Sequence, residues 1–297
     1  MSAPRPELSE SRLGLYMTLP TLVLIGLVAV YPIIDAVWLS LHQVQLQFPQ
    51  LGRPFVGLGN YIALAHEPRF WGALITTSMF TAITVTCELV LGVVLALMLD
   101  RAFAGRGLVR AAVLVPWAFT TVVAALMWKF MYNEDYGVLN ALLLRAHLVS
   151  EPVAWLATPS NAFRAIVIAD VWKTTPFMAL LVLAGLQGIP SEVHEAARID
   201  GAGPASTFFR ITLPLLRPTI LVALLFRTLD AFRVFDLVFV LTRGGPANAT
   251  ESLSYLTYQR LFREFDFGMG SALSVVTFLC VLAISFVFIR VLGARTR

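Results

Sequence analysis

Charged side chains are scarce in this chain, and their scarcity excludes an ordinary soluble protein. Of its 297 residues, 13% are charged and 58% are hydrophobic, and the mean hydropathy is +0.78. Soluble domains carry about 25% charged residues. The composition therefore predicts a protein that crosses a membrane several times. The net charge of +4 does not indicate nucleic-acid binding, because the arginines lie beside apolar runs, so we expect no nucleic-acid partner.

Lysine, cysteine and histidine are also rare, which excludes several kinds of chemistry. The only lysines, Lys129 and Lys173, each follow a tryptophan, so a G-x-x-x-x-G-K-[ST] phosphate loop is absent from the sequence. The cysteines, Cys87 and Cys280, both lie in apolar runs, and the four histidines form no metal-binding pattern. We therefore expect no catalytic residue, no metal site and no bound cofactor in this chain.

Six apolar runs are each long enough to cross a bilayer, which takes about 20 residues. They are Leu13–Leu41, Trp71–Leu99, Leu108–Met131, Ala162–Leu186, Leu215–Leu241 and Gly268–Leu292. This pattern predicts an all-α polytopic membrane protein, with a short N-terminal segment at 1–12 and one six-span domain at 13–297 whose core covers 72–292. The first run is much longer than a signal-peptide core and lacks a small-residue cleavage site, so we expect a retained anchor.

The positive charges beside these runs predict the orientation, because cytoplasmic loops carry an excess of lysine and arginine. One side carries the larger share: Arg5, Arg12, Arg101, Arg106, Arg110, Arg198, Arg210, Arg217, Arg290, Arg295 and Arg297. The other side has seven arginines spread over three longer loops, with Lys129 at a helix end. We therefore expect both termini and the loop at 188–214 to face the cytoplasm.

The loop at 188–214 carries the most specific pattern in the sequence. It contains Glu195-Ala196-Ala197, then Gly201, then Ile211-Thr212-Leu213-Pro214, which reads EAA, three residues, G, nine residues, I-x-L-P. Gly and Pro around it interrupt helices, so we expect two short helices at a bend, with Pro214 in the first turn of the fifth span. An ordinary interfacial amphipathic loop is the alternative, but it does not explain the joint pattern.

This spacing resembles the cytoplasmic coupling loop of ABC importer permeases. The resemblance extends over nearly the whole chain to the binding-protein-dependent carbohydrate permeases of the maltose and trehalose type. The further segments that carry it are Tyr31-Pro32, Gly57-Leu58-Gly59-Asn60-Tyr61, Leu114-Val115-Pro116-Trp117, Asp200-Gly201-Ala202 and Gly244-Gly245-Pro246. The last of these segments favours the carbohydrate branch of the family.

The resemblance implies a fold, partners and a mechanism. The fold would be that of a type I ABC importer, in the cytoplasmic membrane of a bacterium or archaeon. A second, homologous permease subunit would complete the pore. Two copies of an ATPase subunit, which bind ATP and Mg, would dock below, and an extracytoplasmic sugar-binding protein would dock above. The imported sugar would be trehalose, maltose or a related α-linked disaccharide, moved by alternating access.

The resemblance also implies which residues meet the partner proteins. The residues of the ATPase-coupling loop are Glu195, Ala196, Ala197, Asp200, Gly201, Ile211, Leu213 and Pro214. Glu195 is expected to make a charged contact with the ATPase. The turn formed by Gly244, Gly245 and Pro246 is expected on the side of the binding protein.

Charged residues inside the apolar runs are the least expected feature of the sequence. Each costs about 2.5–3.5 kcal/mol at the centre of a spanning helix by insertion scales, so such groups usually face a cavity or a partner. Arg227, Asp230, Ala231 and Val234 share one helical face. Two interpretations stay open: ion pairs of Asp230 with Arg227 or Arg233 and of Arg233 with Asp236, or groups that line a pore.

Aligning the chain with the maltose permease implies where a solute would bind. The positions that correspond to its sugar contacts are Trp117, Thr121, Lys173, Thr174, Arg227, Asp230, Ala231 and Val234. Trp117 and Thr121 are expected to share a face of the third span. Residue types differ from the maltose permease at most of these positions, so the identity of the sugar does not carry over.

Two other functions remain as alternatives. Lys173 and Arg227 would suit a phosphorylated solute, which leaves glycerol 3-phosphate or a glycerophosphodiester possible, although Asp230 would repel a phosphate. A secondary transporter from outside this class would place carboxylates in the membrane for ion coupling, and the candidates are Asp35, Glu88, Asp170, Asp230 and Asp236. The coupling loop and the lack of an evident inverted repeat argue against that second alternative.

Overall fold

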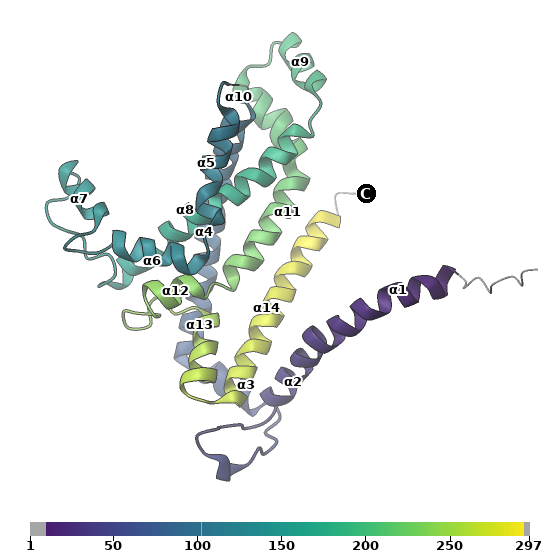
Figure 1. Ribbon diagram of the computed structural model, residues 1–297, viewed down its shortest axis with the longest axis vertical. Helices are drawn as coiled ribbons and strands as arrows, with labels where there is room; N and C mark the ends of the chain where they lie inside the picture. The colour runs from purple at the N-terminus through teal and green to yellow at the C-terminus, as the bar shows by residue number, and fades with distance from the viewer. Residues whose placement is uncertain (1–9, 102, 294–297) are drawn as a thin grey trace, which may run out of the picture. The chain divides into compact units, whose positions relative to one another are not determined.

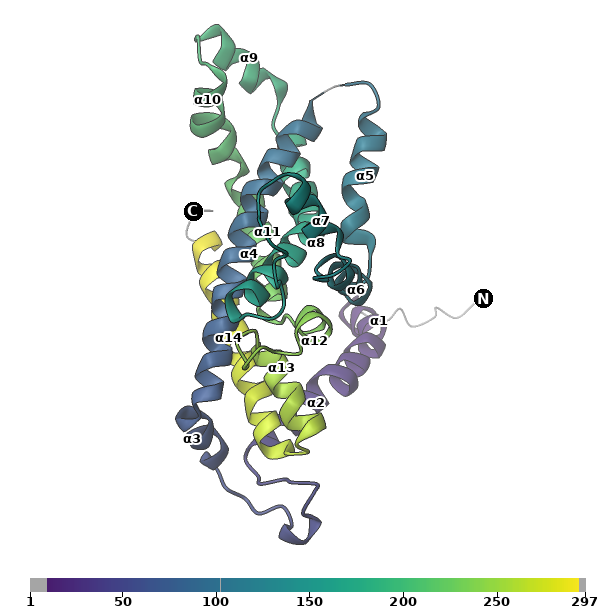
Figure 2. The same cartoon turned by 90° about the vertical axis from the view of Figure 1, so that its left-hand side faces the viewer.

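The computed structural model describes residues 10–101 and 103–293, and within these ranges the chain is built of helices and loops (Figures 1 and 2). The α-helices are α1 (Glu10–Ile25), α2 (Tyr31–Ser40), α3 (Gly59–His66), α4 (Pro68–Asp100), α5 (Arg106–Ala118), α6 (Thr121–Met131), α7 (Val138–Arg145), α8 (Pro159–Gln187), α9 (Ser191–Ile199), α10 (Pro204–Thr207), α11 (Leu213–Phe232), α12 (Asp236–Leu241), α13 (Leu253–Tyr258) and α14 (Phe267–Gly293). Short π-helical turns lie at Gly26–Val30, Phe208–Thr212 and Gln259–Arg263, and a 3-10 turn at Pro49–Leu51. The all-α prediction is confirmed. Of the expected N-terminal segment, residues 1–9, including Arg5, lie outside the described residues, as do Arg295 and Arg297 at the other end.

Five stretches of the described chain are long and apolar enough to cross a membrane as helices. They are Gly14–Ser40, Pro68–Asp100, Pro159–Gln187, Pro204–Leu241 and Phe267–Arg290. The sixth expected span, Leu108–Met131, is divided into α5 and α6, which meet at an angle of 91°. The run is therefore bent, and α5 and α6 together make the sixth span where the bent pair is counted as one. Phe119 and Thr120 both adopt extended conformations, with ψ of 142° and 146°, and so end one helix and begin the next.

The chain divides into two compact units. One contains the described residues up to His66 together with Thr257–Val276. In it, Asn60 Nδ2 donates hydrogen bonds to the carbonyls of Ser40 (2.8 Å) and His42 (3.0 Å). Tyr61 Oη lies 2.6 Å from Ser40 Oγ. The G-L-G-N-Y segment of the sequence thus fixes the chain between α2 and α3.

The other unit contains Glu67–Leu256 and the residues from Thr277 onward, and α4, α8 and α11 pack side by side in it. Small residues allow this close approach, as is usual between helices in a membrane. A Cβ added to Gly92 of α4 would lie 2.7 Å from Met178 Cγ of α8. A Cβ added to Gly185 of α8 would lie 2.8 Å from Thr219 Oγ1 of α11. Two glycines therefore set the spacing of the three helices.

The loop between α8 and α11 forms α9 and a second short helical segment, as expected. The short α10 passes through a π-helical turn at Phe208–Thr212 directly into α11, so Pro214 lies inside a continuous helical segment. Pro is tolerated in the first turn of an α-helix, and a π-turn shifts the hydrogen bonding by one residue just before it. Pro214 therefore lies in the first turn of α11, as expected.

We predict that Gly92→Ala destabilises the protein by about 1–3 kcal/mol, the usual cost of overpacking a tight interface. The matched control is Gly72→Ala in the same helix, where a new Cβ meets no heavy atom within 4 Å. Both changes raise helix propensity, so only the contact with α8 distinguishes them. Thermal unfolding of the purified protein in detergent should show a lower midpoint for Gly92→Ala alone; equal midpoints would contradict the close packing.

Candidate functional site

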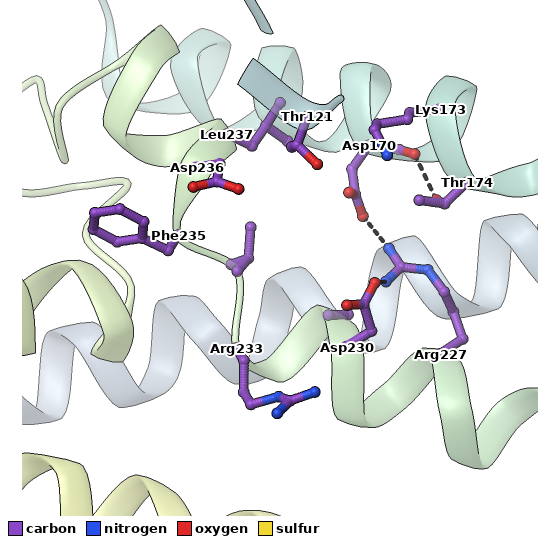
Figure 3. A pocket seen from close by; sticks show the side chains of 12 residues that line it. Thr121, Asp170, Lys173, Thr174, Arg227, Asp230, Arg233, Phe235, Asp236 and Leu237 are labelled. Carbon is purple, nitrogen blue, oxygen red and sulfur yellow. Dashed lines mark hydrogen bonds and ion pairs between the residues drawn. The ribbon is translucent and has the colours of Figure 1, made fainter. Parts of the chain in front are cut away.

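A polar cavity of about 130 Å³ lies where α6, α8 and α11 meet (Figure 3). Its lining residues are Thr121, Asp170, Lys173, Thr174, Arg227, Asp230, Ala231, Arg233, Val234, Phe235, Asp236 and Leu237. This cavity, which we name the polar cavity, brings together seven of the eight residues expected to contact a solute. The eighth, Trp117, lies elsewhere.

The polar cavity lies at a break in the fifth span. Helix α11 ends at Phe232 and α12 begins at Asp236, with the intervening residues in non-helical conformations. Irregular backbone at membrane depth is tolerated only where protein or a water-filled cavity covers it. Because the helix ends there, Val234 does not continue the α11 face that carries Arg227, Asp230 and Ala231. It still lines the cavity.

A cluster of ionisable side chains centred on Arg227, which is 2% exposed, lies at the polar cavity. Its Nε and Nη2 atoms donate to the two carboxylate oxygens of Glu88, over 2.5 and 2.9 Å. Nη2 also donates to Asp170 Oδ2, and Nη1 donates to Asp230 Oδ2 over 2.8 Å. Figure 3 shows Asp170 and Asp230 turned toward the guanidinium group. One cation thus joins carboxylates from α4, α8 and α11.

Glu88, like Asp170, is a member of this cluster that the sequence did not assign to the solute site. It is fully buried (0% exposed), and Thr174 Oγ1 lies 2.6 Å from its Oε1 atom. The signal was a single carboxylate in the second apolar run, which the sequence analysis considered only for ion coupling. The bidentate contact with Arg227 spans 139 residues of sequence, and no local pattern indicates such a pairing.

The structure decides between the ion pairs that the sequence left open. The pair of Asp230 with Arg227 is formed, although Asp230 remains largely exposed, with 71% of its side-chain surface accessible. Arg233 donates to the carbonyl of Leu229 in its own helix, over 3.1 Å. Within residues 10–101 and 103–293, its alternative pairs with Asp230 and Asp236 are not formed.

A second, aromatic cavity of about 320 Å³ adjoins the first. Its lining residues are Trp117, Thr174, Phe177, Phe226, Arg227, Asp230 and Arg233, so it shares four residues with the polar cavity. The rings of Trp117 and Phe177 stack with centroids 5.8 Å apart and planes inclined by 19°. Each of the eight expected residues therefore lines at least one of the two cavities.

Trp117 and Thr121 do not share a helical face, contrary to the sequence prediction. Trp117 belongs to the last turn of α5 and Thr121 begins α6, beyond the 91° bend. The bend directs them to different cavities, Trp117 to the aromatic cavity and Thr121 to the polar cavity.

The expected coupling residues form an exposed helix end and a partly buried return segment. Glu195, Ala196, Asp200 and Gly201 are exposed on or just after α9, whereas Ala197 is buried. Gly201 has a φ of 76°, a left-handed conformation that favours glycine at a helix end. The other expected residues, Ile211, Leu213 and Pro214, are half-buried. Ile199, which ends α9 and was not among the expected coupling residues, is 86% exposed.

The Gly244-Gly245-Pro246 turn is held from within the unit that contains it. Gly244 has a φ of 79°, and a Cβ at this position would lie 2.8 Å from the ring of Tyr255. Thr250 Oγ1 donates to the carbonyl of Gly245 over 2.7 Å. The exposed residues of the turn are the next two, Ala247 and Asn248. Its glycines therefore give the turn its shape, and its tip presents other side chains.

The chain is similar to known transport proteins along most of its length. Residues 88–297 match the family described as binding-protein-dependent transport system inner membrane component. The chain is 47% identical to the trehalose/maltose transport system permease protein MalF of Thermococcus litoralis, over 95% of this chain and 94% of that one. It is 44% identical to the trehalose transport system permease protein SugA of Mycobacterium tuberculosis, over 97% and 91%.

A solved structure shares the fold. It is a bacterial ABC transporter involved in the import of the acidic polysaccharide alginate, with a TM-score of 0.83 over 97% of both chains and 23% sequence identity. The expected transmembrane fold of an ABC importer is thereby confirmed.

We predict opposite structural outcomes for two changes in the ion cluster. Arg227→Ala leaves the buried carboxylates of Glu88 and Asp170 without their cation, and breaking a buried pair in this way costs about 3–5 kcal/mol. Asp230→Ala removes one partner that is largely exposed, so the protein should still fold. Size-exclusion profiles and thermal unfolding should show loss of folded protein for the first variant only. A stable Arg227→Ala protein would contradict the structural role of the cluster.

Proposed function

Since this chain belongs to the family of binding-protein-dependent transport system inner membrane components, we propose that it is one permease subunit of an ABC importer for a sugar. The favoured solutes are trehalose, maltose or a related α-linked disaccharide. The similarity to a trehalose/maltose permease and to a trehalose permease supports this choice.

The observation that carries the proposal is the pair of adjoining cavities within the spanning helices. A sugar presents hydroxyl groups on its edges and apolar C–H groups on its ring faces. The polar cavity offers hydroxyl and carboxylate side chains such as Thr121 and Asp230, and the aromatic cavity offers the stacked rings of Trp117 and Phe177. An apolar pocket with a few well-placed polar groups is the usual form of a small-molecule site.

The solute path in this proposal runs through the eight residues that line the two cavities. Trp117 would stack on a sugar ring, while Thr121 and Asp230 would hydrogen-bond its hydroxyl groups. The remaining members of the set, Lys173, Thr174, Arg227, Ala231 and Val234, would shape or hold the walls. Arg227 is buried and already paired, so its part in this scheme is mainly to orient its carboxylate partners.

The loop at 188–214 would be the contact with the ATPase subunits. Helix α9 presents Glu195, Ala196 and, at its end, Ile199 to the surroundings. Small and exposed residues allow a partner groove to approach closely, and Glu195 would supply a charged contact. ATP and Mg would be bound and used by two copies of a partner ATPase. Closure of that pair would move α9 and switch the pore between its two faces.

The proposal includes two further partners, of which the binding protein appears in the name of the family. The 13–297 domain would form the pore together with a second, homologous permease subunit. An extracytoplasmic sugar-binding protein would dock above the turn at Gly244–Pro246. Both termini would lie in the cytoplasm of a bacterial or archaeal cell. The exposed tip at Ala247 and Asn248 is the part of the turn most accessible to the binding protein.

A first experiment measures ATPase activity of the reconstituted four-subunit complex with its binding protein, over trehalose, maltose, sucrose and glycerol 3-phosphate. We expect stimulation by an α-linked disaccharide. Asp230→Ala should lower the apparent affinity for the stimulating sugar by about ten- to a hundredfold, because a lost hydrogen bond to a charged group costs about 1.5–3 kcal/mol. Stimulation by glycerol 3-phosphate alone would contradict the sugar proposal and make Lys173 an anion-binding group.

A second experiment tests the coupling loop through Glu195→Lys. Reversal of this charge should uncouple the ATPase, so that both transport and solute-stimulated hydrolysis fall strongly while solute binding persists. The matched control is Glu151→Lys, an exposed carboxylate in the loop before α8, at the other end of that helix from α9. Unchanged transport in Glu195→Lys would exclude the proposed contact.

A further inference from the structure

Arg227 is the most deeply buried cation lining the cavities, yet it has little capacity left for a ligand. A guanidinium group carries five N–H donors in a fixed plane. Glu88 takes two of these donors, Asp170 one and Asp230 one. A single N–H of Nη1 remains, and the side chain is 2% exposed. Arg227 is therefore positioned to hold carboxylates in place, and its positive charge is already paired with carboxylates of the same chain.

The groups that this anchor presents to the cavities are hydrogen-bond acceptors. The Asp230 carboxylate has one contact with Arg227 and is 71% exposed, and Asp170 also lines the polar cavity. A carboxylate has about four acceptor positions on its two oxygens. Most of those positions on Asp230 thus face the cavity, where they match the hydroxyl donors of a neutral solute.

The charge around the polar cavity adds to this preference. Its described lining includes the cations Lys173, Arg227 and Arg233 and the carboxylates Asp170, Asp230 and Asp236, which balance. Glu88, behind Arg227, adds a fourth carboxylate and makes the formal total −1. Three of the four carboxylates bond to Arg227 itself, so the excess of negative charge is concentrated around that residue.

We propose that Glu88 is a positioning residue that makes the solute site discriminate against anionic sugars. It touches no solute, since it is fully buried. It acts by occupying two donors of Arg227 and by adding the negative charge that repels a phosphate, sulfonate or uronate group. This inference rests on the proposed function of the cavities as a solute site, and it deepens that proposal by setting the charge class of the substrate.

The fold alone does not set the charge of the solute. A transporter of the same fold takes part in the import of an acidic polysaccharide, so the fold itself is compatible with an anionic solute. Side chains must therefore set the charge preference. If Glu88 had a solely structural role, its substitution would lower the stability of the protein. The ratio of affinities for a neutral and an anionic sugar would stay unaltered.

The test compares trehalose with trehalose 6-phosphate, which differ by one phosphate group. Binding of each labelled sugar is measured on the purified permease–ATPase complex without binding protein, so that the specificity of that protein does not intervene. The wild-type complex should bind trehalose and exclude the phosphate. Glu88→Gln keeps the size of the side chain but removes its charge, so we expect the ratio of phosphate affinity to trehalose affinity to rise about tenfold or more.

Two controls separate charge from packing. Glu88→Asp keeps the negative charge and should keep the wild-type ratio. Glu251→Gln alters another buried carboxylate, 1% exposed, whose partner is Arg69 and which lines neither cavity; it should also keep the ratio. If Glu88→Gln does not assemble, Asp230→Asn tests the same charge from an exposed position and should raise the ratio in the same direction.

The outcomes are distinct. A higher ratio in an assembled Glu88→Gln complex, together with the wild-type ratio in both controls, supports the proposal, and an unchanged ratio in that complex overturns it while the solute site stands. Where Glu88→Gln does not assemble, the same two outcomes are read from Asp230→Asn. A wild-type complex that binds neither sugar overturns the solute site itself, and the inference falls with it.

Discussion

The buried contact between Arg227 and Glu88 is the interaction on which the rest of the spanning unit depends. A charge inside a membrane is costly unless it is paired, and this one is paired across three helices, α4, α8 and α11. These contacts form where the three helices pack closely. At Gly92 and Gly185 the neighbouring helix leaves no room for a Cβ atom. Close packing of the three helices and the ion pairs of Arg227 therefore occur together in this unit.

Much of the fold followed from the sequence, and so did most of the candidate site. Hydropathy located the spans, and the charges at Arg227 and Asp230 were conspicuous because apolar runs seldom contain them. Other features were hidden. The partner of Arg227 lies 139 residues away, and the bend at Phe119–Thr120 lies in an apolar run whose last helix breaker is Pro116. Tertiary contacts decide such points, and local patterns record only the tendency of each segment.

The loop at 188–214 joins the two helices that supply most of the cavity walls. Helix α8 carries Asp170 and Thr174 and ends just before α9, and α11 follows the loop and carries Arg227. From Thr174 to the end of α8 is roughly 20 Å at 1.5 Å per residue. Under the proposed function, a displacement of α9 would reach the cavity through two rigid rods that the ion cluster joins at the other end.

The bend between α5 and α6 has a consequence for the surroundings of the chain. The first backbone N–H groups of α6 have no acceptor within the helix. Thr120, at the N-cap position, accepts no hydrogen bond from them through its side chain. Hydrocarbon cannot satisfy such groups. Hydration from the polar cavity, which Thr121 lines, or the surface of another subunit must therefore cover this corner. The bend thus marks a part of the spanning region that lipid acyl chains do not contact.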